Sequence, residues 1–173
     1  MKHFRWLAAG AALAAAGAAN AGEFSATITA TSDYDFRGVS LSARDPALQV
    51  SLDWAAENGF YVGAWASNIH SGPDVDGDIE LDLYAGFAGE TSGGLGWDVG
   101  LTWYTYPGSS SSPTKEKILD YPELYAGLSY GAFELKQWYT NDAFGFGDDA
   151  FYTELNAGAE GVVRVPLLEF ECP

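Results

Sequence analysis

The chain is short of basic residues, of cysteine and of long apolar runs, and each shortage excludes a class of protein. Only 8 Lys and Arg oppose 24 Asp and Glu, which gives a formal net charge of −16. This balance argues against nucleic-acid binding, which depends on basic surfaces. The single cysteine, Cys172, allows no internal disulfide. After the N-terminus no stretch approaches the roughly 20 apolar residues of a transmembrane helix, so we expect a soluble protein or a membrane β-barrel.

The first 21 residues have the pattern of a secretory signal peptide. Lys2 and Arg5 precede or flank an apolar run over 6–19, and Ala19-Asn20-Ala21 supplies the small-x-small pattern of a cleavage site. We therefore predict a signal peptide over 1–21, cleaved after Ala21. The remainder divides into a β-barrel domain over 22–158 and an atypical tail over 159–173.

Apolar and polar residues alternate strictly along much of the mature chain. Leu48, Val50, Leu52 and Trp54, for example, alternate with polar residues at 49, 51 and 53. In a strand this period places the apolar side chains on one face. Eight strands are predicted, and most have the length that a tilted strand needs to cross an outer membrane. They are 23–32, 48–54, 60–67, 79–87, 95–104, 123–130, 133–140 and 150–158.

Connections between these strands alternate between short and long, as they do in outer-membrane barrels. The short ones, at 57–59, 88–94 and 131–132, are expected on the periplasmic side. The long ones, at 33–46, 68–78, 106–118 and 141–149, are expected outside. Aromatic residues gather near the short turns, as in an interfacial girdle: Trp54, Phe60, Phe87, Trp97, Tyr130 and Phe133. The pattern predicts an all-β, antiparallel up-and-down transmembrane β-barrel, and a soluble β-sandwich is the alternative.

Carboxylates dominate the face opposite the apolar one. On that face only Lys136 opposes seven acidic residues, which we predict to line a pore: Asp53, Glu80, Asp82, Asp98, Glu123, Glu134 and Glu154. Charges are costly against lipid, so this face belongs to the lumen, and a negative lumen favours cations. The alternative is a filled barrel in which these residues solvate the interior.

Other polar motifs give weaker signals. Residues 74–80 place carboxylates at alternate positions like the start of a calcium loop, but the glycine is misplaced for an EF-hand. His70 lies in the same connection and could pair with Asp74 or Ser71, but no third group would orient it as a base. Arg37 is expected to form an exposed ion pair with Asp33 or Asp35. We expect no catalytic residue, no metal ligands and no cofactor.

Several short motifs are similar to those of one known family. They are 33–40 (DYDFRGVS), 45–49 (DPALQ), 59–68 (GFYVGAWASN), 80–86 (ELDLYAG), 104–108 (YTYPG) and 123–130 (ELYAGLSY). In combination they resemble the TorF-type porins, also known as Gcw_chp proteins of uncharacterised function, over about residues 23–158.

The resemblance implies a bacterial outer-membrane β-barrel with a channel role and no established substrate. Its expected partners are outer-membrane lipid and small solutes or ions. Family members usually continue for several more strands and end in an aromatic residue, whereas residues 162–173 do neither. Because Pro166 and Pro173 disfavour a paired strand, we expect a truncated or frameshifted chain and an incomplete barrel.

Overall fold

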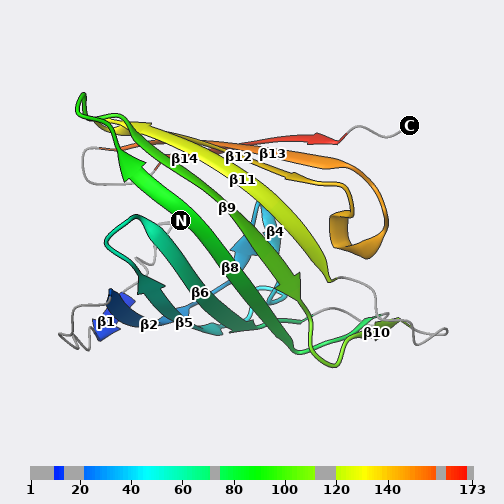
Figure 1. Ribbon diagram of the computed structural model, residues 1–173. Coiled ribbons are helices and arrows are strands. Elements are labelled where there is room, and N and C mark those ends of the chain that lie inside the picture. Colours follow the sequence, from blue (N-terminus) through cyan, green and yellow to red (C-terminus); the bar gives the residue numbers. More distant parts are fainter. Residues whose placement is uncertain (1–9, 14–21, 71–74, 112–119, 159–162, 171–173) are drawn as a thin grey trace, which may run out of the picture.

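The computed structural model describes residues 10–13, 22–70, 75–111, 120–158 and 163–170. They form one main antiparallel sheet in which each strand pairs only with its neighbours in chain order (Figure 1). Its strands are β1 (Gly10–Leu13), β2 (Glu23–Thr31), β5 (Ala47–Ala55), β6 (Phe60–Asn68), β8 (Ile79–Glu90), β9 (Gly96–Thr105), β11 (Tyr121–Tyr130), β12 (Phe133–Thr140), β13 (Ala150–Ala157) and β14 (Val163–Phe170). The predicted all-β, antiparallel up-and-down architecture is confirmed.

All eight predicted strands are present, and the main sheet has two more, β1 and β14, where the sequence predicted none. β14 pairs with β13 along its whole length and sets Pro166 opposite Glu154. The expectation that Pro166 disfavours a paired strand here was wrong, because β14 has a partner on one side only among the described residues and an edge strand tolerates a missing N–H. Pro173 lies outside the described residues.

The sheet curls around an interior but does not close (Figure 1). Within the described residues β1 and β14 are its two edges, and no pairing joins them. β1 lies inside the predicted signal peptide, where Gly10–Leu13 pair with Ala26–Thr29 of β2. This pairing belongs to the uncleaved chain, and cleavage after Ala21 stays a prediction.

The two faces of the sheet differ sharply in chemistry. Apolar side chains on the convex face, here called the outer face, are exposed; both Leu52 and Leu124 keep 57% of their surface accessible. A sandwich would bury this face against a second sheet. The predicted aromatic residues also form a row there near the short turns, with Phe60 5.2 Å from Phe87 and 6.1 Å from Trp54 between ring centroids.

Short turns join the strands at one end of the sheet and long connections join them at the other. Asn58-Gly59 forms one short turn, where Gly59 adopts a φ of +88° and donates to the Ala56 carbonyl. The long connections carry the hairpin of β3 (Asp35–Phe36) and β4 (Val39–Ser40), the pair β7 (Val75–Asp76) and β10 (Ser110–Ser111), and the 3-10 helix η1 (Ala143–Gly145). No helix among the described residues is long and apolar enough to cross a membrane.

The buried core lies under these long connections. Its members are Tyr34, Ala47, Ile69, Tyr104, Tyr106 and Tyr121. The β3–β4 hairpin packs on the inner, concave face of the main sheet (Figure 1), where Tyr34 contacts Trp65 of β6 and Phe36 contacts Tyr104 of β9. The 33–46 connection is therefore a packed internal element, where the sequence suggested a loop facing outward.

Candidate functional site

Local hydrogen bonds fix the shape of the 33–46 connection. The Asp33 carboxylate accepts hydrogen bonds from the hydroxyls of Ser40 at 2.6 Å and Ser42 at 3.0 Å. The bond from Ser40 is the largest influence on Asp33 and holds the pKa of its carboxyl below the usual value. The Tyr34 N–H donates to Ser42 Oγ at 2.9 Å, and the Leu41 N–H donates to the Tyr34 carbonyl at 2.7 Å. The hairpin is thus closed at its base.

Arg37 stands at the tip of this hairpin and reaches across to β11. Its two terminal nitrogens donate to the two oxygens of Glu123 at 2.7 and 2.6 Å. The side chains are 14% and 3% exposed, so this is a buried bidentate ion pair. The expectation that Arg37 forms an exposed pair with Asp33 or Asp35 was wrong. Their oxygens bind serine hydroxyls and the Gly38 N–H instead, which leaves Arg37 to enter the interior.

Aromatic rings from three segments enclose the guanidinium. Its central carbon lies 4.6 Å from the ring centroid of Phe36, 5.4 Å from Trp138 and 4.3 Å from Tyr152. Burial acts to lower the pKa of Arg37, but the hydrogen bonds and charge of Glu123 more than offset this and raise it. Arg37 therefore stays charged, held by one carboxylate and by the faces of the rings.

Three of the seven predicted carboxylates lie together beneath the hairpin. Glu80 is fully buried and Asp82 is 8% exposed. The charges of Glu80 and Glu123 both act on Asp82. Glu80 accepts a hydrogen bond from the Tyr106 hydroxyl at 3.0 Å and another from Tyr34. Burial and the charge of Glu80 raise the pKa of both tyrosines. One oxygen of Glu80 and one of Asp82 are buried without a described partner.

The other four carboxylates lie nearer the short turns and are more accessible. Asp98 binds the ammonium of Lys136 at 3.0 Å and the Tyr61 hydroxyl. Asp53 accepts hydrogen bonds from the hydroxyls of Tyr84 and Ser51. The Asn156 amide donates to both Glu134 and Glu154, and the Tyr152 hydroxyl also donates to Glu154. The structure thus places all seven residues on the inner face, three of them covered and four facing more open space.

Glycines on the inner face make room for tyrosine rings from neighbouring strands. A Cβ on Gly63 would stand 2.5 Å from the Tyr84 ring, and one on Gly86 would stand 2.5 Å from the Tyr61 hydroxyl. The Tyr61 and Tyr125 hydroxyls also hydrogen-bond each other. These tyrosines narrow the interior between the hairpin and the short turns.

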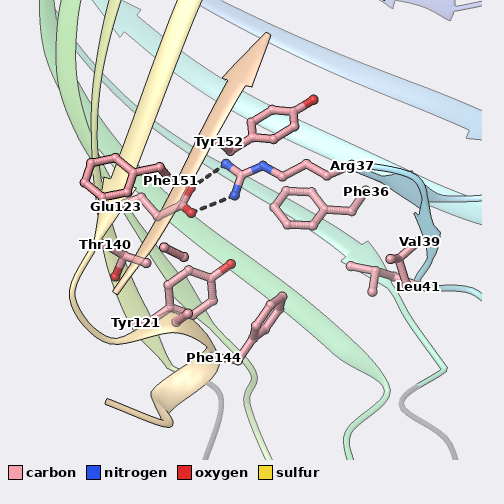
Figure 2. Close-up of a pocket in the computed structure, with 12 residues that line it drawn as sticks. Phe36, Arg37, Val39, Leu41, Tyr121, Glu123, Thr140, Phe144, Phe151 and Tyr152 are labelled. Atoms are coloured by element: carbon pink, nitrogen blue, oxygen red, sulfur yellow. Dashed lines mark hydrogen bonds and ion pairs between the residues drawn. The ribbon is translucent and has the colours of Figure 1, made fainter. Parts of the chain in front are cut away.

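A mainly apolar cavity of about 240 Å³ opens between the hairpin and the wall of the sheet (Figure 2). We call it the aromatic pocket. Its lining is Phe36, Arg37, Val39, Leu41, Tyr121, Glu123, Thr140, Ala143, Phe144, Ala150, Phe151 and Tyr152. A second, more polar cavity of about 350 Å³ shares Phe36, Arg37 and Tyr152 with it and also reaches Trp138 and Glu154. Arg37 therefore stands between the two.

The weaker polar motifs gain little from the structure. Asp74 and Ser71, the suggested partners of His70, lie outside the described residues. The backbone N–H of His70 donates to the Leu41 carbonyl at 2.7 Å, which ties its connection to the first one. Among the described residues no group of three or more acidic, histidine or cysteine side chains is arranged to hold a metal ion.

Sequence reasoning missed the partner of Arg37 and the aromatic pocket. The available signal was that the bulky residues Tyr34, Phe36 and Arg37 stand close together in a connection rich in Asp and Ser. Bulky aromatic residues in a loop indicate packing against something, but nothing in the pattern says that the contact is with β11 and β13.

Comparison with known proteins places the chain without giving it an activity. Neither the curated proteins nor the solved structures contain a significant match. One family model does match, over residues 15–166. The match spans the strands and long connections described above, from β2 into β14. The chain therefore belongs to the family described as bacterial protein of unknown function (Gcw_chp).

Proposed function

We propose that this protein is an outer-membrane, porin-like channel for small hydrophilic solutes, with a preference for cations. The observation that carries the proposal is the two-sided wall, with exposed apolar side chains outside and carboxylates inside. In water such an outer face would be a large aggregation-prone patch, and against lipid it is favourable.

The cation preference follows from the inner face. Seven carboxylates oppose Arg37 and Lys136, each of which pairs with one of them. The field of the four more accessible carboxylates would reach about 8–10 Å into the lumen near physiological salt. Cations would therefore enter more readily than anions, and the preference would fade as salt rises.

The test is the reversal potential of the full chain in a planar bilayer under a salt gradient. Asp53→Asn combined with Glu134→Gln and Glu154→Gln removes three accessible charges and should reduce the cation preference. Glu57→Gln in a short turn, combined with Glu90→Gln at the turn end of β8, is the control that should change it less. Anion selectivity of the unaltered protein, or equal effects of the two variants, would contradict the proposed lumen.

A barrel with a filled interior is the second candidate, and a specific observation favours it. The β3–β4 hairpin and the tyrosines at 61, 84 and 125 occupy much of the inner space. In that case the external loops would carry the function by binding partners. A membrane-inserted protein that never conducts would support this candidate over the channel.

A further inference from the structure

We propose that the aromatic pocket is a binding site for a small neutral molecule with one aromatic ring and an oxygen acceptor. The pocket is built from five separate segments, namely the β3–β4 hairpin, the start of β11, the end of β12, η1 and the start of β13 (Figure 2). This inference does not depend on conduction, because residues of the hairpin and of one side of the sheet form the walls of the pocket whether or not the sheet closes.

Size and lining define the first part of the ligand. A cavity of about 240 Å³ exceeds the roughly 150 Å³ that accommodates benzene in an apolar protein interior. Phe36, Tyr121, Phe144 and Tyr152 present aromatic surface to it. An aromatic ring bearing a small substituent fits this volume and stacks against such walls.

Arg37 defines the polar group. A guanidinium has five N–H donors, and among the described residues only Glu123 accepts from Arg37, through two of these donors. None of the others donates to a described residue, so they are available to a carbonyl or hydroxyl oxygen. The pairing with Glu123 leaves no net charge there, and Glu80 and Asp82 lie close by. An anionic ligand is therefore disfavoured, and a cation would have to displace Arg37.

Backbone strain points to the same place. Only four non-glycine residues with described geometry have positive φ, and two of them, Arg37 and Phe144, line this pocket with φ of 53°. L-residues adopt this conformation at a cost, and such strain gathers at binding sites. At Phe144 it turns the ring toward Tyr121, 5.1 Å away between centroids.

The experiment uses the full chain in lipid nanodiscs and follows the fluorine NMR linewidth of 4-fluorobenzamide. Empty nanodiscs correct for partition into lipid. The protein should broaden the fluorine resonance of this probe. The charged analogues 4-fluorobenzoate (anionic) and 4-fluorobenzylammonium (cationic) should bind more weakly. Broadening no greater than in empty nanodiscs, or equal binding of all three probes, would overturn the proposal.

Two variants locate the binding. Ala143→Leu fills the pocket and should weaken binding by about tenfold or more, the scale expected when a packed site is overfilled. Phe144→Gly removes a wall and relieves the positive φ, so it should weaken binding without straining the fold. Ala132→Leu, in the exposed β11–β12 turn, is the matched control and should bind like the unaltered protein. Unchanged affinity in both pocket variants would place the probe elsewhere.

Discussion

Arg37→Ala is the substitution that tests the internal packing of the hairpin most directly. It removes the guanidinium from Glu123 and from the rings of Phe36 and Tyr152. Glu123 is 3% exposed and would stay buried beside Asp82 and Glu80 without a counter-charge. Because both partners of the pair are far less than a third exposed, solvent screening gives little relief.

The expected loss is about 3–5 kcal/mol of the free energy of unfolding, the range for breaking a buried ion pair by removing one partner. Most of this cost is the stranded carboxylate rather than lost attraction. Arg37→Met combined with Glu123→Leu removes both charges and keeps apolar contact with the rings, so it should recover most of the stability, as apolar replacements of buried pairs often do.

Urea unfolding in lipid vesicles, followed by tryptophan fluorescence, measures both variants against the unaltered protein. Trp65 and Trp138 lie against the hairpin and report on its release. If Arg37→Ala lost less than about 0.5 kcal/mol, the range of an ordinary surface substitution, the pair would contribute as an exposed pair does and the reasoning would fail. A double variant no more stable than Arg37→Ala would show that apolar contact does not replace the ion pair.

Three further predictions follow from separate features. Gly63→Ala should displace the Tyr84 ring, which stands 2.5 Å from the added Cβ, and should lower the unfolding free energy by about 1–3 kcal/mol, whereas Gly93→Ala in an open turn should not. Leu52→Arg on the outer face should cost about 2–4 kcal/mol of insertion stability near the bilayer midplane, measured by the same urea titration. The lowered pKa of Asp33 stabilises the hairpin above the unfolded pKa of about 3.9, and this contribution should be lost as pH falls through the folded pKa; Asp33→Asn should abolish that acid transition in Trp65 fluorescence.

Strand positions could be predicted from the sequence because period-2 alternation is a local signal. Leu48, Val50 and Leu52 indicate both the strand and its outward face without reference to any other part of the chain. The short turns were predictable for a similar reason, since Asn58-Gly59 has the backbone freedom that a tight turn needs. The strands then pair with their neighbours in chain order, and the turns and the shared apolar face set the register.

The candidate site could not be predicted in the same way, because it depends on contacts between distant residues. Arg37 and Glu123 are 86 positions apart, and Asp33 and Asp35 offered nearer carboxylates. Those nearer groups bind Ser40, Ser42 and the Gly38 N–H instead. Local hydrogen bonds of this kind compete well with ion pairing because they need no side chain to be ordered at long range. β14 was missed for the opposite reason, since a local rule about proline was applied without knowing that the strand lies at an edge.

The contacts that hold the hairpin come from strands in the middle of the sheet and from β13. Among the described contacts none involves an edge strand, β1 or β14. Tyr34 packs on β6, Phe36 on β9, and Arg37 on β11 and β13. Strands that close the sheet would pair at its edges, beyond β2 on one side and at or beyond β14 on the other. Closure would therefore decide whether the interior conducts while leaving the walls of the aromatic pocket in place. Ligand binding and conduction are for this reason separable properties, and failure of the bilayer experiment would leave the fluorine NMR result fully interpretable.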